Sequence, residues 1–89
     1  MPESPFKKHR SLLLAPHGAA KFLRLFTLSM WDGSTYKVGV SRLGFLDEEH
    51  LAIMHELLAH YCKHGERDSS FMRVALECAD TFERNKEKI

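Results

Sequence analysis

The stretch DEEHLAIMHELLAHYCKHG, residues 47–65, decides the fold, because it predicts one long amphipathic helix with recognisable ends. Asp47 is a good N-cap, since its carboxylate accepts hydrogen bonds from free amides of the first turn. Gly65 is placed to take the left-handed conformation that commonly ends a helix. Apolar side chains recur between these ends at helical spacing and form one stripe: Leu51, Met54, Leu57, Leu58 and Tyr61.

Two further segments show the same periodicity. Residues 19–30 carry large apolar side chains on one side, with Lys21, Arg24 and Thr27 on the other. Residues 69–84 form a similar stripe, and either Asp68 or Ser69 can cap the helix. The sequence therefore predicts an all-α fold, a small three-helix bundle. We expect the charged tail after this third helix to fray.

The connector between the first two helices is ambiguous. Residues 36–40, YKVGV, alternate as a short strand does. No second segment offers a partner strand, and a lone strand is not stable within one chain. We therefore predict an extended or short-strand connector, the strand only as an edge that pairs across a dimer. A single turn over residues 41–45 precedes the central helix.

The first 18 residues differ in composition from the rest. Residues 1–10, MPESPFKKHR, contain two prolines and a basic cluster, which is typical of a flexible arm. Residues 12–15 are apolar, and Pro16 ends that run. We predict that residues 1–18 are a flexible basic arm with a short apolar segment, and that residues 19–89 form a single helical domain.

Charge is divided unevenly along the chain, with +5 over residues 1–46 and −4 over residues 47–89. We favour the interpretation that a basic first helix packs beside acidic ones, although a basic surface offered to an acidic partner is the alternative. Lys7, Lys8 and Arg10 are the candidates for contacts with nucleic-acid phosphates. Acids at the start of the central helix would repel a nucleic-acid backbone there.

Six histidines raise the question of a metal site. His55 and His60 are five residues apart and diverge around the helix, whereas the zinc-protease motif needs a spacing of four. Glu56, His60 and His64 share one face and are the candidate metal ligands. A solvated helix face explains them better, because no further ligand is evident. We expect no metal and no cofactor.

Other chemistry is not indicated. Cys62 and Cys78 lack metal-type spacing and lie near apolar faces, so we expect two reduced core thiols. A glycine-rich phosphate loop and a nucleophile constellation are both missing from the sequence, so we do not expect an enzyme. No apolar run approaches transmembrane length, and residues 12–15 are too short for a signal sequence. We expect a cytoplasmic protein without membrane contact.

A second contact surface is predicted beside the end of the first helix. Leu28 lies at the edge of the polar side, and Trp31, Tyr36 and Phe45 lie near the connector. Aromatic residues beside a turn are good interface anchors. A domain this small also gains stability by dimerising, so a homodimer is predicted. Ordinary core packing explains the same residues equally well.

The middle of the chain also resembles a known group of proteins. A helix is followed by WDG at residues 31–33, by VSRL at residues 40–43, by LD at residues 46–47, and by a helix rich in Leu and Met. This order is similar to a family of short uncharacterised proteins carried on proteobacterial plasmids and other mobile elements. The resemblance covers residues 19–60, brings no catalytic residues, and implies a bacterial or phage accessory protein.

These observations lead to one expected function and two alternatives. We expect a small non-enzymatic protein–protein interaction module, of the kind that a mobile element uses as an accessory or anti-defence factor against a host protein complex. The first alternative is an accessory nucleic-acid-binding protein that uses the basic N-terminal half. The second is a metal-binding helical protein.

Overall fold

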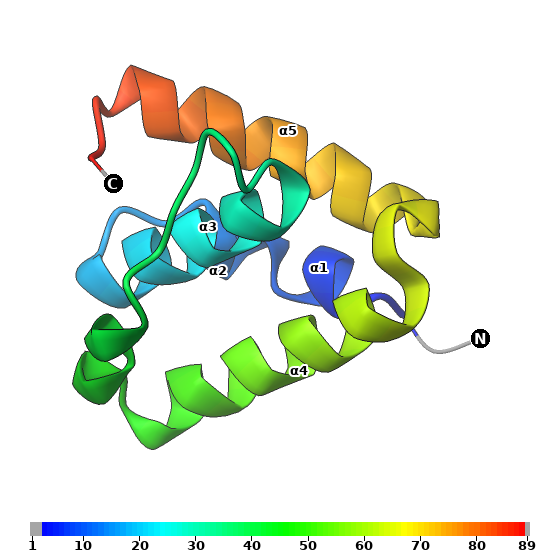
Figure 1. Ribbon diagram of the computed structural model, residues 1–89, viewed down its shortest axis with the longest axis horizontal. Coiled ribbons are helices and arrows are strands. Elements are labelled where there is room, and N and C mark those ends of the chain that lie inside the picture. Colours follow the sequence, from blue (N-terminus) through cyan, green and yellow to red (C-terminus); the bar gives the residue numbers. More distant parts are fainter. Residues whose placement is uncertain (1–2, 89) are drawn as a thin grey trace.

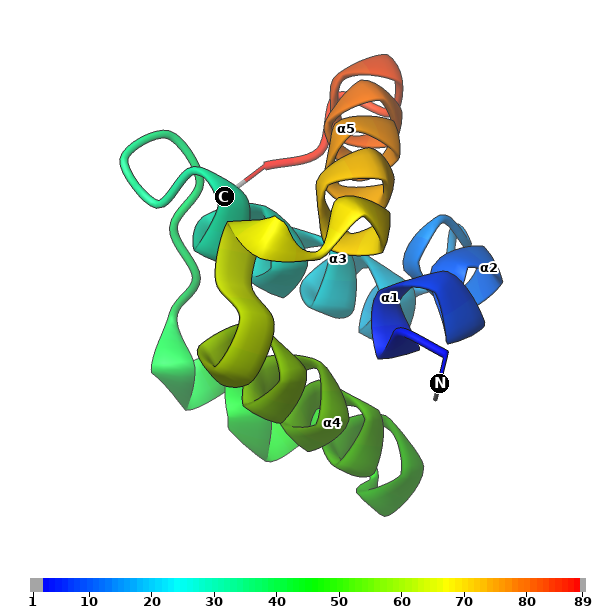
Figure 2. The same cartoon turned by 90° about the vertical axis from the view of Figure 1, so that its right-hand side faces the viewer.

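The computed structural model describes residues 3–88, which contain five α-helices and two 3₁₀ helices. The elements are α1 (Pro5–Lys8), α2 (Arg10–Leu13), α3 (Gly18–Trp31), η1 (Val40–Phe45), α4 (Glu48–His64), η2 (Gly65–Arg67) and α5 (Ser69–Arg84). In Figures 1 and 2, α3 crosses the middle of the molecule, with α4 on one side and α5 on the other. The predicted all-α class is confirmed. Among the described helices, none is long and apolar enough to cross a membrane.

The long helices begin and end where local chemistry dictates. The Asp47 carboxylate accepts a hydrogen bond from the His50 amide at 2.8 Å, and Gly65 ends α4 with a φ of 56°. Only glycine adopts that conformation without strain. The Asp68 carboxylate accepts from the Ser70 amide at 2.9 Å and so caps α5. The predicted central and third helices are therefore confirmed.

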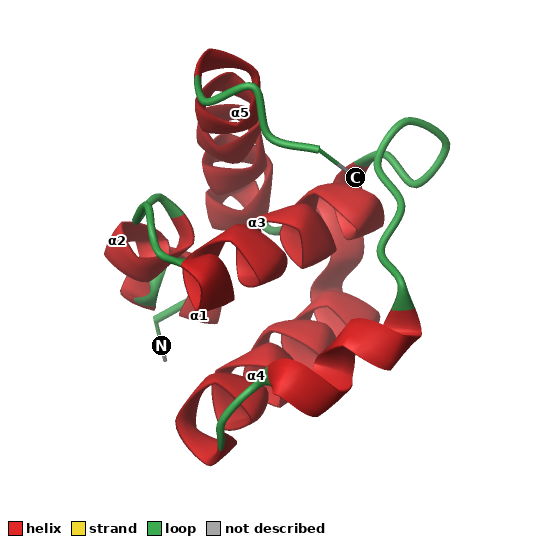
Figure 3. Ribbon diagram, turned by 90° about the vertical axis from the view of Figure 1, so that its left-hand side faces the viewer, coloured by secondary structure: helices red, strands yellow, loops and turns green. Residues whose placement is uncertain are grey.

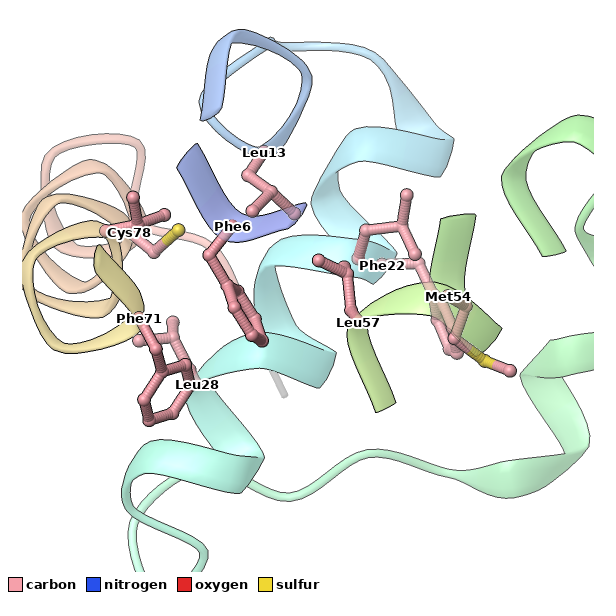
Figure 4. Close-up of a cluster of buried hydrophobic side chains, with 10 residues drawn as sticks. Phe6, Leu13, Phe22, Leu28, Met54, Leu57, Phe71 and Cys78 are labelled. Carbon is pink, nitrogen blue, oxygen red and sulfur yellow. The ribbon is translucent and has the colours of Figure 1, made fainter. Parts of the chain in front are cut away.

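A single core draws on all five α-helices, and Figure 4 shows its members pointing toward one another. Phe6 of α1 and Leu13 of α2 are fully buried, as are Leu57 of α4 and Phe71 of α5. The Phe6 and Phe71 rings meet edge to face with centroids 4.8 Å apart, a favoured aromatic geometry. Residues near both ends of the described chain therefore contribute to one core.

The flexible arm predicted for residues 1–18 is corrected, because residues 5–13 form α1 and α2 and pack on the core. Ser4 caps α1 by accepting from the Phe6 amide, and Pro5 takes the first helical position, where its missing N–H costs nothing. The prolines therefore start a helix. The predicted three-helix bundle is also incomplete, because the two short helices α1 and α2 pack with the three long ones. Residues 1–2 of the predicted arm and residue 89 of the predicted domain lie outside the described part.

The connector is extended, and no strand forms anywhere in residues 3–88. Residues 36–39 run without regular structure, and the predicted turn is the 3₁₀ helix η1. Tyr36 and Val38 pack against the core instead of pairing with a strand. The Tyr36 ring meets Phe82 edge to face at 5.3 Å between centroids. Side-chain burial therefore fixes this segment, and the short-strand alternative is wrong.

The packing of α1 yields a direct stability prediction. Phe6→Ala removes a fully buried aromatic ring, and we expect the free energy of unfolding to fall by about 3–5 kcal/mol. Urea denaturation followed by circular dichroism measures this change. The control is Lys7→Ala at the exposed neighbouring position, for which we expect a change within about 0.5 kcal/mol. Equal losses in the two variants would contradict the packed position of α1.

Candidate interaction surface

A buried ion pair joins three parts of the chain. The Arg24 side chain of α3 is fully buried, and the Glu87 side chain is 7% exposed. The Arg24 Nε donates to a Glu87 carboxylate oxygen at 2.9 Å, and its Nη2 donates to the other oxygen. Its Nη1 donates to the carbonyls of Leu13 at 2.7 Å and Ala15 at 2.9 Å. Arg24 was expected on the solvent side of its helix, and this placement is wrong.

The ion pair holds the tail after α5 against the start of α3. Lys86 adopts a φ of 52°, in the left-handed region, which reverses the chain after α5. The Glu87 amide then donates to the Phe82 carbonyl at 3.0 Å. In Figures 1 and 3 the C-terminal tail therefore lies near the beginning of α3. The predicted fraying of this tail is wrong up to Glu87.

A small hollow beside this tail is lined by four cationic side chains, and we call it the basic hollow. The four cations are Lys21, Arg42, Lys86 and Lys88. The cavity measures about 270 Å³, with apolar contributions from Leu25 and Phe82. All four cations are exposed. None of them forms an ion pair with another described residue. Glu87 also lines the hollow, but its carboxylate is paired with Arg24, so the hollow carries a net positive charge.

An apolar groove adjoins the basic hollow, and Arg42 lines both. The groove measures about 330 Å³ and is lined by Gly18, Ala19, Phe22, Arg42, Phe45 and Leu46. The Arg42 guanidinium lies 5.4 Å from the centre of the Phe22 ring, within the range of a cation–π contact. Phe45 is 90% exposed and Val40 is 73% exposed. The groove and these exposed apolar side chains together make this surface a candidate contact site.

Two acidic side chains follow Phe45 in the chain, at the start of α4. Glu48 and Glu49 occupy the first turn of α4, where negative charge is favourable. Both are exposed and form no ion pair with another residue in the range 3–88. We call the basic hollow, the apolar groove with Phe45, and these two glutamates together the end face. Figure 3 views this end, where the C-terminal tail, the start of α3, η1 and the start of α4 come together.

The end face includes one of the four predicted interface residues, Phe45. Leu28 is fully buried, because α3 is covered by both α4 and α5, so its predicted role in an exposed interface is wrong. Trp31 and Tyr36 are partly buried against the core, with ring centroids 6.3 Å apart. The packing of these three residues follows the alternative explanation, ordinary core.

The candidate metal ligands Glu56 and His60 contact different side chains and do not converge on one site. The Glu56 carboxylate lies 2.8 Å from His9 and 3.5 Å from Lys8. His60 lies 2.9 Å from the Asp68 carboxylate and stacks on His64 with ring centroids 4.4 Å apart. Over residues 3–88, no group of three or more His, Cys, Asp or Glu side chains is arranged to hold a metal ion.

The predicted phosphate-contacting residues are partly neutralised within the fold. Lys8 faces Glu56, and Arg10 makes a two-pronged ion pair with Glu77 of α5. Lys7 is exposed beside them. Lys7 and Arg10 line a hollow of about 410 Å³ together with Arg73. This second basic patch is weaker than the basic hollow, because Glu77 offsets one of its three cations.

The two cysteines lie in different settings. Cys62 is exposed on α4, so its predicted core position is wrong; the buried side of that helix carries Met54 and Leu57 instead. Cys78 is buried as predicted, and burial raises the pKa of its thiol to about 12. A thiol with that pKa is protonated and unreactive at neutral pH.

The end face offers apolar contact and charges of both signs, which are the elements of a binding surface. Sequence reasoning missed Lys86 and Lys88 because it treated the tail as frayed. Pairing Arg24 with Glu87, 63 residues away, would have revealed that the tail is packed and that Lys86 and Lys88 have fixed positions. The reason to look for such a pair is that a buried arginine needs an acidic partner. Comparisons of the chain with protein-family models, with curated proteins and with solved structures find no match.

Loss of the buried ion pair tests its role in holding the tail. Arg24→Met leaves the Glu87 carboxylate without its partner, and we expect the free energy of unfolding to fall by about 3–5 kcal/mol. Chemical denaturation measures the loss. Arg84→Met is the control, because the Arg84–Asp80 pair is exposed and contributes about 0–1 kcal/mol. Similar small effects in both variants would show that the tail is not fastened through Arg24.

The same ion pair predicts a pH dependence of stability. Burial alone would raise the pKa of Glu87, but hydrogen bonds from Arg24 and Asn85 bring it below its ordinary value of 4.5. A carboxylate with a lowered folded-state pKa stabilises the fold above its unfolded-state pKa, and this contribution is lost as pH falls through the folded-state pKa. The stability difference between the unaltered protein and Glu87→Gln should therefore be constant at neutral pH and shrink below pH 4.5. Denaturation curves across pH measure it, and a difference that grows on acidification would contradict this assignment.

Proposed function

We propose that the protein is a non-enzymatic protein-interaction module that binds another protein through its end face. The exposure of Phe45 carries this proposal, because burying a phenylalanine side chain is worth about 1.5–3 kcal/mol that the isolated chain leaves unused. The groove beside Phe45 is apolar and the adjoining hollow is basic. An apolar centre with a charged rim is the usual anatomy of a protein interface.

The biological setting of this binding is also a proposal. Residues 19–60 resemble short proteins of plasmids and other mobile elements, and such elements use small proteins to block host complexes. We therefore extend the proposal to an accessory or anti-defence factor whose partner belongs to a host protein complex. The small size of the chain supports this role, because one exposed end face suffices for a blocking contact.

Nucleic-acid binding is a second candidate, favoured by the patch of Lys7, Arg10 and Arg73. These cations surround one hollow and come from three different helices. Glu77 binds Arg10 there and lowers the local positive charge. An aromatic side chain for stacking on bases is absent from the residues that line this hollow. Protein binding through the end face is therefore the better-supported function.

Affinity capture from a native-host lysate tests the choice between these functions. We expect the unaltered protein to retain a protein partner after nuclease treatment, and Phe45→Ser to reduce recovery at least about tenfold, since 1.4 kcal/mol of lost contact has that effect. The control is Leu76→Ser, which alters a 58% exposed leucine on α5. Mass spectrometry quantifies the recovered proteins.

Two results of this experiment, and one result of a separate activity assay, would count against the proposal. Recovery that disappears with nuclease would favour nucleic-acid binding, and Lys7→Glu should then weaken it. Equal recovery by Phe45→Ser and Leu76→Ser would exclude the end face as the contact surface. Turnover of any substrate by the purified protein would contradict a non-enzymatic function.

A further inference from the structure

The end face carries charges of opposite sign on the two sides of one exposed aromatic side chain. In Figure 1 the C-terminal tail and the start of α3, which carry cations of the basic hollow, lie on one side of η1, and the start of α4, which carries Glu48 and Glu49, lies on the other side; Phe45 ends η1. From this arrangement we infer that the end face binds a second copy of this chain in a two-fold symmetric dimer. The inference rests on the proposed function only in treating the end face as a protein-binding surface.

Two-fold symmetry makes such a surface complementary to itself. An axis near Phe45 places the basic half of each protomer opposite the acidic half of its partner. Lys21 and Lys86 of one protomer then face Glu48 and Glu49 of the partner, and the same contacts repeat on the other side of the axis. All four side chains are exposed and form no ion pair with another described residue within their own chain.

The apolar groove supplies the centre of this contact. In the dimer the Phe45 ring of each protomer enters the groove of its partner, where Gly18 and Ala19 leave room beside Phe22. A side-chain carbon added at Gly18 would meet no atom within 4 Å, so the groove is open there. The interaction therefore combines a central aromatic anchor with charged contacts at the rim.

The size of the end face sets the expected strength of the dimer. Across its long axis the molecule extends 27 × 23 Å, so a flat contact over this whole end covers at most roughly 600 Å². A stable interface of standard size buries about 800 Å² from each partner. The dimer is therefore expected to dissociate on dilution, which leaves the end face free for another protein at low concentration.

The charges of the end face also argue against two other binding partners, an acidic peptide and a nucleic acid. An acidic peptide attracted to the basic hollow would meet Glu48 and Glu49 on the other side of Phe45. A nucleic-acid strand would meet the same repulsion, and Phe45 is the one exposed aromatic on this part of the described surface. A second copy, unlike either of these partners, satisfies both the cations and the acids of the end face.

Charge reversal provides the test. Lys21→Glu/Lys86→Glu makes the end face acidic, and Glu48→Lys/Glu49→Lys makes it basic, so each double variant should repel its own copies. Sedimentation equilibrium should show self-dissociation constants at least about tenfold higher than that of the unaltered protein. An equimolar mixture of the two variants should restore the dimer as a heterodimer. The matched controls are Lys63→Glu in the last turn of α4 and Glu66→Lys in η2, which should dimerise normally because these elements lie at the opposite end of the molecule (Figure 1).

A second measurement uses the unaltered protein, in case a double variant fails to fold. A zero-length carbodiimide reagent is applied to an equal mixture of ¹⁴N- and ¹⁵N-labelled chains. We expect cross-linked peptides of mixed label that join Glu48 or Glu49 to Lys21 or Lys86. Cross-links with only uniform labels would show that the contacts lie within one chain and would overturn the inference.

The remaining outcomes separate this inference from the proposed function. A protein that stays monomeric at millimolar concentration, or variants that do not recover when mixed, would overturn the dimer. If Phe45-dependent capture of a host protein persisted in that case, the proposed function would stand without the dimer. Dimerisation through the end face together with failed capture would support the inference and remove the proposed host partner.

Discussion

The fold depends on how the charge of Arg24 is satisfied inside the protein. A guanidinium taken out of water is costly unless every donor finds an acceptor. Here the acceptors come from the segment before α3 and from the tail after α5, so burial of one side chain brings together residues 13–15, 24 and 87. Over residues 3–88, no buried side-chain nitrogen or oxygen lacks a hydrogen-bond partner. The ion pair therefore fixes the position of two chain segments that have few other reasons to meet.

The end face follows from the same constraint. Because Glu87 is held against α3, Lys86 and Lys88 lie beside Lys21 and Arg42, and four cations gather where the sequence shows only scattered ones. The helix start that follows η1 requires acids for its own reasons, since negative charge favours the N-terminus of α4. The two kinds of charge on the end face thus have independent causes: a long-range ion pair positions the cations, and helix capping favours the acids. The proposed binding surface therefore corresponds to no motif that could be read from the sequence.

Features that depend on neighbouring residues in the chain, such as the ends of helices, could be predicted from the sequence. Asp47, Gly65 and Asp68 mark helix ends by their own backbone chemistry, and the structure shows those ends where they were expected. Arg24 was misplaced because helical periodicity assigns a side chain to a face but does not say what covers that face. Leu28 was misplaced for the same reason, since two helices cover α3 from different sides. Pro5 was taken as a sign of disorder, whereas Ser4 before it makes the pair a helix start.

The order of synthesis gives the Arg24–Glu87 pair a further meaning. A ribosome makes Arg24 long before Glu87, and the two are 63 residues apart. Until Glu87 has left the exit tunnel, the Arg24 side chain of the nascent chain lacks the carboxylate that pairs with it in the folded protein, so we expect the burial of α3 to be incomplete. A prematurely terminated fragment would keep that apolar helix accessible to chaperones and proteases. The stability of α3 in the folded protein therefore depends on a carboxylate that is synthesised 63 residues after the arginine with which it pairs.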